Sequence, residues 1–173
     1  AIIFDWAGTL YKKNKGLFPY SEKVLRNLSS KYKLAVISKA VFDNVETRLK
    51  QINEIGNYFD VIIADVDKTK EQYVECMKKM NVKPENTLVV DDRTLRGIKI
   101  GNILSCKTAW IQQGEYSHEI PNEETGQKGA EVEGFLTDRY GFTPRTTSPE
   151  SRPSVFLLHP FSGLITSDGT IPQ

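Results

Sequence analysis

Residues 2–9 read IIFDWAGT, and this stretch decides how the rest of the chain is interpreted. Three apolar residues form a short run of the buried-strand type that ends at Asp5, and Gly8-Thr9 then marks a tight turn. A carboxylate in this position lies close to backbone N–H groups of the turn, which favour its ionised form and a bound anion. The stretch therefore predicts a buried strand that carries a carboxylate to one end of a sheet.

Strand and helix patterns alternate from this stretch as far as Ile111. Four more apolar runs are of the buried-strand type: Leu34–Ile37, Tyr58–Ile63, Leu88–Val90 and Thr108–Ile111. Three segments between them have an apolar helical face, formed by Val24, Leu25 and Leu28 after a cap at Ser21, by Val45, Leu49 and Ile52, and by Tyr73, Met77 and Met80. A last short helix is expected from Leu95 to Gly101, with the glycine near its end. This order predicts an α/β fold, a Rossmann-like doubly wound parallel sheet of about five strands.

The composition changes after residue 127. Residues 1–127 contain 15 Lys and 4 Arg, whereas residues 128–173 contain 1 Lys and 3 Arg. The last 46 residues also hold 10 Pro plus Gly and 11 Ser plus Thr, which is typical of a weakly structured tail. We therefore divide the chain into a core, residues 1–127, and a tail of separate character, residues 128–173, in which Val132, Phe135 and Leu136 are spaced for one closing helix.

Charge and cysteine content exclude several classes of protein. The chain has 23 Lys plus Arg against 22 Asp plus Glu, a net charge of +1, which gives no overall footprint for nucleic acid. Cys76 and Cys106 are too few for a disulfide scaffold or a four-cysteine zinc site, and reduced thiols predict a cytoplasmic protein. The apolar start is interrupted by Asp5, so it is neither a signal sequence nor a membrane span.

Polar residues follow each predicted strand, at the edge where ligands bind in sheets of this kind. Two adjacent carboxylates are costly unless a cation compensates them, and Mg²⁺ takes oxygen ligands. A hydroxyl and an ammonium group supply what is needed to hold a phosphoryl group. Each residue alone also fits a helix cap or a loop position, but the ordered set favours a Mg²⁺ and phosphoryl site. Its members are Asp5, Ser38, Asp65 with Asp67 and Lys68 nearby, the pair Asp91-Asp92, and Gln112.

Four of these segments, taken in order, resemble the motifs of the haloacid dehalogenase superfamily of phosphoaspartate hydrolases. The matching segments are residues 4–10 (FDWAGTL), residues 36–38 (VIS), Lys68, and residues 89–92 (VVDD), and together they cover roughly residues 1–120. Lys68 is near the spacing that the family usually has before its acidic motif, and Lys70 is the alternative. The resemblance does not extend to the tail.

The resemblance implies a role for each matching residue. Asp5 would attack phosphorus and form an aspartyl-phosphate. Ser38 would bind the transferring phosphoryl group, and Lys68 would neutralise its charge. Mg²⁺ would be bound by Asp5, Asp92 and the backbone carbonyl of Ala7, with Asp91 acting through water. The implied substrate is a phosphorylated compound.

Two departures from the family pattern modify this expectation. The position of Ala7 usually holds an aspartate that protonates the leaving group, and alanine cannot transfer a proton, which favours substrates with good leaving groups. Residues 5–9 (DWAGT) are also similar to the first motif of phosphonoacetaldehyde hydrolase, whose C–P bond cleavage needs a Schiff-base lysine from a cap domain. Arg96 and Gly97 stand where the family usually has another acidic residue, which lowers the expected metal affinity.

The lengths between the motifs predict a protein without a cap domain. Between Leu10 and Leu34 lie 23 residues, enough for a hairpin flap and one helix, and between Ser38 and Lys68 lie 29, enough for one helix and one strand. The resemblance then implies an open site, suited to a macromolecular substrate or closed by a homo-oligomer. The main hypothesis is a Mg²⁺-dependent phosphatase. The alternatives are a non-catalytic phosphate-binding or scaffold protein and a C–P bond hydrolase that receives its lysine from another chain.

Overall fold

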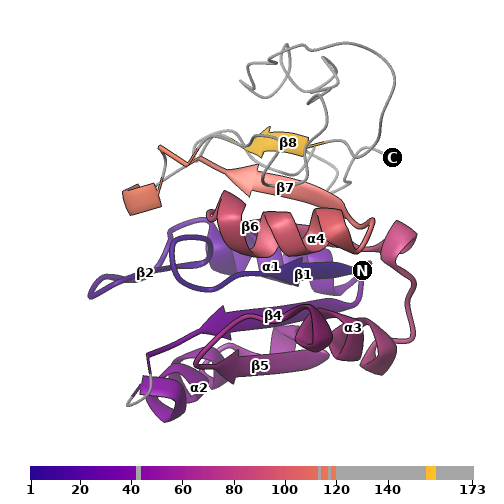
Figure 1. Ribbon diagram of the computed structural model, residues 1–173. Helices are drawn as coiled ribbons and strands as arrows, with labels where there is room; N and C mark the ends of the chain where they lie inside the picture. Colours follow the sequence, from indigo (N-terminus) through magenta and orange to yellow (C-terminus); the bar gives the residue numbers. More distant parts are fainter. Residues whose placement is uncertain (42–43, 113, 117, 120–154, 159–173) are drawn as a thin grey trace, which may run out of the picture.

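Six parallel strands form the central sheet of the computed structural model, which describes residues 1–41, 44–112, 114–116, 118–119 and 155–158. The spatial order is β5-β4-β1-β6-β7-β8 (Figure 1). The first five strands in this order are the five expected ones, so the predicted doubly wound α/β core is confirmed. Their bounds are β1 (Ile2–Phe4), β4 (Leu34–Lys39), β5 (Val61–Asp65), β6 (Leu88–Asp91), β7 (Lys107–Ile111) and β8 (Val155–Leu158).

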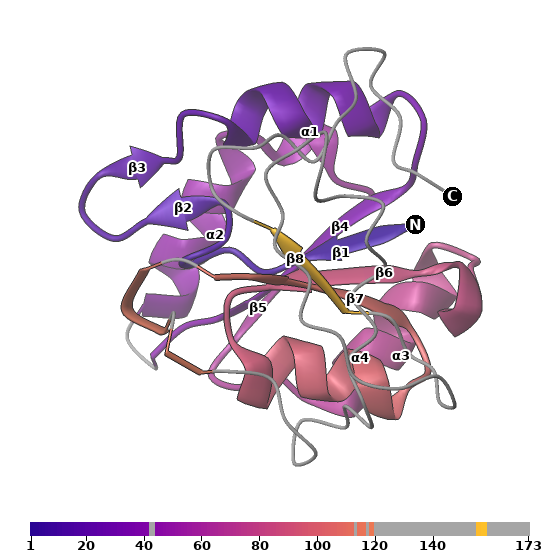
Figure 2. The ribbon, with the colours of Figure 1, turned by 90° about the horizontal axis from the view of Figure 1, so that it is seen from above.

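Helices cover both faces of this sheet (Figure 2). On one face lie α1 (Ser21–Ser29) and α2 (Val45–Asn53), and on the other lie α3 (Lys70–Lys79) and α4 (Lys99–Ile103). Successive residues of a strand point to opposite faces, so Ile2 and Phe4 belong to the core under α1, whereas Ile3 belongs to the core under α3. Burial on both sides explains why the strands read as continuous apolar runs.

Successive strands are added first on one side of β1 and then on the other, and this defines where a site can form. From β1 the chain passes to β4 and β5 on one side, and it then returns to β6 on the other side of β1. Phe4 pairs with Val36 of β4 and with Val90 of β6. The residue after Phe4 therefore lies between the ends of two neighbouring strands, at the switch point where ligands bind in open α/β sheets.

A small hairpin follows β1, as expected for the flap. Strands β2 (Tyr11–Lys12) and β3 (Gly16–Leu17) pair antiparallel. Trp6 is fully buried beneath the hairpin and stacks on Tyr11, with ring centroids 5.3 Å apart. The hairpin is thereby held against the loop that follows β1.

The expected starts of β5 and α1 were wrong. Residues Gly56–Tyr58 form the 3₁₀ turn η2, closed by the Phe59 N–H on the Gly56 carbonyl, so β5 begins only at Val61. Ser21 does not cap α1 but is its first residue, and its hydroxyl donates to the Leu10 carbonyl at 2.7 Å.

The helix expected from residue 95 to 101 is also different. It starts as a π-helical turn, η4 (Thr94–Ile98), and continues as α4 to Ile103. Gly101 lies inside α4, where a Cβ would be 2.7 Å from Cγ2 of Thr108, so this glycine allows close contact with the sheet and does not end the helix. Two further short turns are η3 (Pro84–Asn86) and η5 (Gly114–Tyr116).

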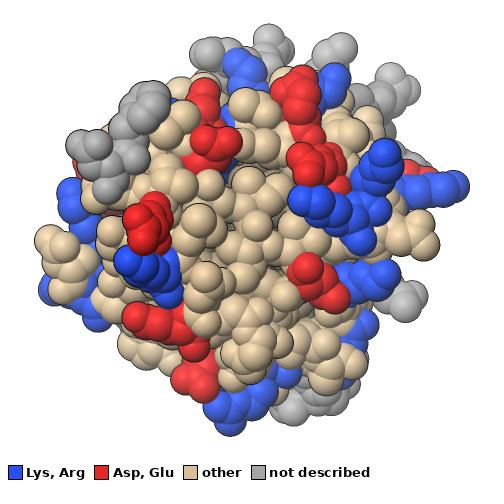
Figure 3. Space-filling model, turned by 90° about the horizontal axis from the view of Figure 1, so that it is seen from below, with Lys and Arg blue, Asp and Glu red and all other residues tan. Residues whose placement is uncertain are grey.

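The tail contributes one element to the described structure. Strand β8 pairs parallel with β7 at the edge of the sheet, whereas the expected closing helix at Val132, Phe135 and Leu136 lies outside the described residues. Among the helices of the described part, none is long and apolar enough to cross a membrane. Acidic and basic side chains are interspersed over the face shown in Figure 3, in keeping with the net charge of +1.

Candidate active site

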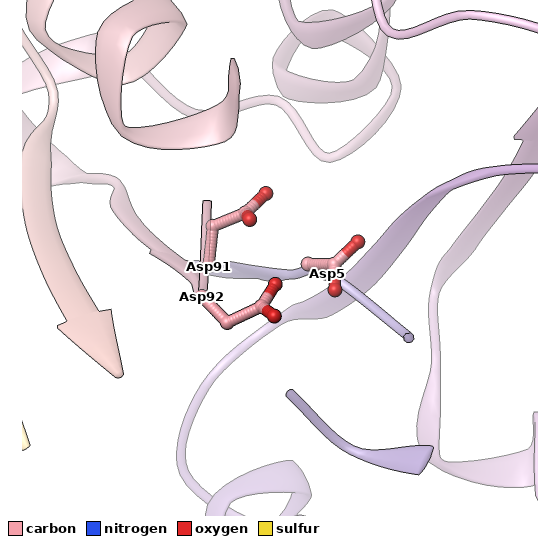
Figure 4. A group of neighbouring side chains, drawn as sticks. All are labelled: Asp5, Asp91 and Asp92. Carbon is pink, nitrogen blue, oxygen red and sulfur yellow. The ribbon is translucent and has the colours of Figure 1, made fainter. Parts of the chain in front are cut away.

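Three carboxylates meet at the ends of β1 and β6 (Figure 4). Asp5 directly follows β1, Asp91 is the last residue of β6, and Asp92 comes next. Each offers one oxygen, and these oxygens all lie within 4.8 Å of one another. All three residues are buried, with exposed fractions of 7%, 0% and 1%. The sheet topology thus concentrates negative charge in a place that water reaches poorly.

Lys68 provides the positive charge that this cluster needs. Its Nζ lies 2.5 Å from Oδ1 of Asp5 and 2.7 Å from Oδ2 of Asp91. Lys68 stands just before α3, where the Thr69 side chain and Gln72 form a capping box that fixes the start of the helix. Lys70, the alternative considered from the sequence, is exposed on the first turn of α3. Of the two lysines, Lys68 is the one that reaches the carboxylates.

The pKa values in the cluster reflect one ammonium group among three carboxylates. Burial lowers the pKa of Lys68, but the charges of Asp5 and Asp91 outweigh it, so that this pKa lies well above its usual value. Burial raises the pKa of Asp91 to about 6, although Lys68 opposes the shift. Burial together with the charges of Asp5 and Asp91 raises the pKa of Asp92 to about 9. The cluster therefore lacks positive charge when all three carboxylates are ionised.

The donor set fits a hard divalent cation. Oδ2 of Asp5 and Oδ1 of Asp92 are buried and have no hydrogen-bond partner within the part of the chain that the structure describes. Gly8, with φ +94°, brings the backbone of the turn against Asp92, because a Cβ at residue 8 would overlap the Asp92 carboxylate. Unpartnered buried carboxylate oxygens are costly unless a cation binds them. Oxygen ligands at this spacing are the kind that Mg²⁺ takes.

Asp91 lies against Gly97, one of the two positions where the sequence lacks the expected acidic residue. A Cβ on Gly97 would overlap Oδ2 of Asp91, so a side chain at residue 97 would displace this carboxylate. The backbone N–H of Arg93 donates to Oδ1 of Asp91 at 2.8 Å, and Lys68 holds the other oxygen. Asp91 is thus fixed from both sides by the chain's own groups.

Ser38 lies near the end of β4, beside β1, and is also buried. Its Oγ accepts a hydrogen bond of 2.5 Å from Nη1 of Arg48 on α2. Arg48 has no place in the motifs and was missed from the sequence. A signal did exist, because residue 48 lies three positions after Val45 and four before Ile52, on the inward face of the helix.

A family model for haloacid dehalogenase-like hydrolases matches residues 2–111, which is more than half of the chain. The chain belongs to this family. The match runs from β1 to the end of β7 and contains every residue of the buried cluster. No curated protein sequence matches the chain.

Solved structures share the family's fold with this chain. An uncharacterized protein from Listeria monocytogenes serotype 4b has a TM-score of 0.59 and 16% identity, covering 91% of this chain and 89% of its own. A haloacid dehalogenase (HAD) phosphatase from Thermococcus onnurineus has a TM-score of 0.52 and 18% identity, with 62% of this chain and 52% of its own covered. The putative HAD-hydrolase YfnB from Bacillus subtilis, solved bound to magnesium, has a TM-score of 0.50 and 20% identity, with 61% and 50% covered. The chain thus spans about half the length of the last two.

Asp65 and Asp67, which were also named from the sequence, lie apart from the buried cluster. Asp65 is exposed and accepts from the Gln72 side chain, and Asp67 forms an exposed ion pair with Lys39 at 2.9 Å. Ala7 is exposed on the loop between β1 and the hairpin, directly before Gly8, whose backbone lies against the Asp92 carboxylate. The roles assigned to the matching residues stay predictions.

Arg93 connects the loop after β6, which begins with Asp92, to the segment after β7. Its Nε and Nη2 both lie close to Oε1 of Glu119, at 2.7 and 2.6 Å, and its guanidinium lies 3.5 Å from the ring centre of Tyr116. Since Arg93 follows Asp92 directly, these contacts support the loop that carries the carboxylates. No pattern in the sequence indicates this contact.

Proposed function

We propose that this chain is a Mg²⁺-dependent phosphohydrolase that works through an aspartyl-phosphate on Asp5. The observation that supports this most strongly is the buried cluster in which Lys68 bridges Asp5 and Asp91 while Asp92 lies beside them. A buried carboxylate held by an ammonium group, with further carboxylates for a metal, is the arrangement needed for nucleophilic attack on phosphorus.

In the proposed reaction, a carboxylate oxygen of Asp5 forms a bond to phosphorus while the bond from phosphorus to the leaving oxygen breaks. The leaving group takes that electron pair, and the product on the protein is a mixed anhydride. Water then attacks this anhydride, which releases inorganic phosphate and restores the Asp5 carboxylate. Lys68 balances charge on Asp5 and on the phosphoryl oxygens, and Ser38 donates its hydroxyl hydrogen to one of them.

Asp5, Asp92 and the Ala7 carbonyl would hold the metal, with Asp91 assisting through water. When bound, Mg²⁺ supplies positive charge that offsets the carboxylates and the phosphoryl oxygens. The buried oxygens of Asp5 and Asp92 that have no partner among the described residues support this assignment. The magnesium-bound neighbour from Bacillus subtilis belongs to the same superfamily and supports it as well.

The residue at position 7 restricts the substrate in this proposal. Alanine supplies no proton to the leaving oxygen, and general acid help is worth about 10²–10⁴ in rate. Acyl and aryl phosphates have leaving groups that need no proton, so they are the substrates we expect. The hairpin and α1 are the only elements described between β1 and β4, which supports an uncapped site open to macromolecular substrates or covered by a second copy.

Turnover of acetyl phosphate, of p-nitrophenyl phosphate and of an alkyl phosphate, glycerol phosphate, by the wild type and two variants tests the proposal. Asp5→Asn should abolish turnover while the unfolding temperature shows an intact fold. Ala7→Asp should raise turnover of alkyl phosphates by about 10²-fold or more, because residue 7 is exposed and has room for a carboxylate. Full activity in Asp5→Asn would exclude the mechanism.

A scaffold or phosphate-binding protein is the second candidate, favoured by Ala7 and by the absence of a side chain at Gly97. No gain in Ala7→Asp, together with no turnover in the wild type, would favour it. For C–P bond cleavage an imine-forming lysine is required, and Lys68 does not suit this role because its pKa is raised well above the usual value by Asp5 and Asp91 against the effect of burial. Borohydride trapping of an imine would detect a lysine from elsewhere.

A further inference from the structure

Arg48 is a partly buried cation next to the proposed phosphoryl site. Its Nη1 donates to Oγ of Ser38 at 2.5 Å and to the Lys39 carbonyl at 3.3 Å. Both acceptors belong to the end of β4, so a single guanidinium nitrogen ties α2 to the strand that carries Ser38. The Asp5 carboxylate is near enough to oppose the lowering of the Arg48 pKa that burial causes.

No carboxylate within the described ranges forms an ion pair with Arg48. The ion pairs of these residues involve Arg26, Lys39, Lys50, Lys68, Lys79, Lys83 and Arg93. The other basic side chain of α2 differs, since Lys50 pairs with Glu46 on the exposed side of the helix. A partly buried charge that has no ion-pair partner among the described residues is costly, and an anion that enters the site would reduce this cost.

The hydrogen bond to Ser38 also fixes what the hydroxyl can do. A hydroxyl has one hydrogen to donate and two lone pairs that accept. Because the guanidinium has no lone pair to offer, Ser38 must accept from Arg48, and its own hydrogen stays available for another oxygen. A guanidinium has five N–H groups in a planar fork, so Nε and Nη2 remain able to bind an oxyanion beside the Ser38 hydroxyl.

We propose that Arg48 is a phosphoryl-binding residue, which orients the Ser38 hydroxyl through Nη1 and binds a phosphoryl oxygen through its remaining N–H groups. This inference rests on the proposed function and adds a second cation to it. Arg48 lies at the end of β4, on one side of β1, whereas Asp91 ends β6 on the other side. The site then holds the phosphoryl group between an ammonium and a guanidinium. Such a site favours a phosphoryl oxyanion by its two positive charges and by the paired N–H donors of the fork.

The test measures inhibition by inorganic phosphate, with Mg²⁺ present and p-nitrophenyl phosphate as substrate, for the wild type, Arg48→Ala, Arg48→Lys and the control Lys50→Ala. Loss of a charge-assisted hydrogen bond should weaken phosphate binding about 10- to 100-fold in Arg48→Ala and change it little in Lys50→Ala. Arg48→Lys should recover only part of the affinity, since an ammonium cannot reproduce the fork. Added guanidinium ion should restore activity to Arg48→Ala, a recovery that a purely structural residue would not give.

The double variant Ser38→Ala/Arg48→Ala separates the two parts of the proposal. A larger loss than in Ser38→Ala alone is expected if Arg48 also contacts the phosphoryl group, and equal losses would show that it acts only through Ser38. If Arg48→Ala does not fold, Arg48→Gln and Arg48→Lys take its place. Unchanged phosphate inhibition in all Arg48 variants overturns the inference and leaves the proposed function standing. A wild type that neither turns over substrate nor binds phosphate overturns both.

Discussion

Replacement of Lys68 by methionine is the sharpest test of how the cluster is held together. The substitution keeps the unbranched side chain up to the position of Cε but removes the ammonium group that lies 2.5 Å from Asp5 and 2.7 Å from Asp91. The Lys68 side chain is only 2% exposed and those of Asp5 and Asp91 are 7% and 0% exposed, so water cannot replace it. Removal of one partner from a buried ion pair costs about 3–5 kcal/mol. We expect the free energy of unfolding to fall by about this amount in EDTA at pH 8.

The loss should depend on pH in a defined direction. Burial raises the pKa of Asp91 to about 6 even with Lys68 present, and removal of the ammonium raises it further. The folded state then keeps protons that the unfolded state releases, so stability falls as pH rises above the ordinary carboxyl pKa. The deficit of Lys68→Met should therefore be smaller at pH 5 than at pH 8.

Urea unfolding followed by circular dichroism at both pH values measures these effects. Lys70→Met, an exposed lysine two residues away, is the matched control and should change stability little. The pair Lys68→Met/Asp91→Asn should recover part of the loss, because the unpaired charge at residue 91 is gone. A loss below about 1 kcal/mol for Lys68→Met, the size typical of a surface pair, would refute the reasoning.

Two further predictions concern the metal and the room around Asp91. Burial and neighbouring charge raise the pKa of Asp92 to about 9, so the metal-free protein should lose stability as pH rises from 5 to 9. The increase in unfolding temperature that Mg²⁺ produces should grow over the same pH range. An increase in unfolding temperature that stays constant with pH would contradict this. Gly97→Ala should weaken Mg²⁺ binding by about 10-fold or more in calorimetry, because its Cβ displaces Asp91. Gly56→Ala, where a Cβ would make ordinary contacts at 3.4 and 3.5 Å, is the control, and equal Mg²⁺ affinity in both variants would exclude a role for the space at residue 97.

The central part of the fold could be predicted because burial on both faces makes each inner strand a continuous apolar run. The convergence of Asp5 with Asp91 and Asp92 follows from the same reasoning, since parallel strands end at one edge of the sheet. The boundary of β5 was not predictable in this way, because the aromatic residues Tyr58 and Phe59 have high strand propensity and yet lie in and after a 3₁₀ turn.

The remaining misses concern contacts between elements distant in sequence. Arg48 belongs to a helix whose pattern shows only an apolar face and charged neighbours, and its partner Ser38 is known only once α2 is packed on the sheet. Ser21 looked like a helix cap, but the hairpin brings the Leu10 carbonyl within reach of its hydroxyl. Strand β8 lies in a segment rich in Ser, Thr and Pro, and its partner β7 is more than 40 residues away in the chain.

The most direct test of the aspartyl-phosphate proposal is calorimetric titration with Mg²⁺ and beryllofluoride, which mimics the aspartyl-phosphate. The wild type, Asp5→Asn and the control Asp65→Asn are compared, since Asp65 also ends a strand but is exposed and outside the cluster. We predict tight binding of beryllofluoride that requires Mg²⁺, is lost in Asp5→Asn and is kept in Asp65→Asn. Binding that persists in Asp5→Asn, or no binding to the wild type, would contradict the account.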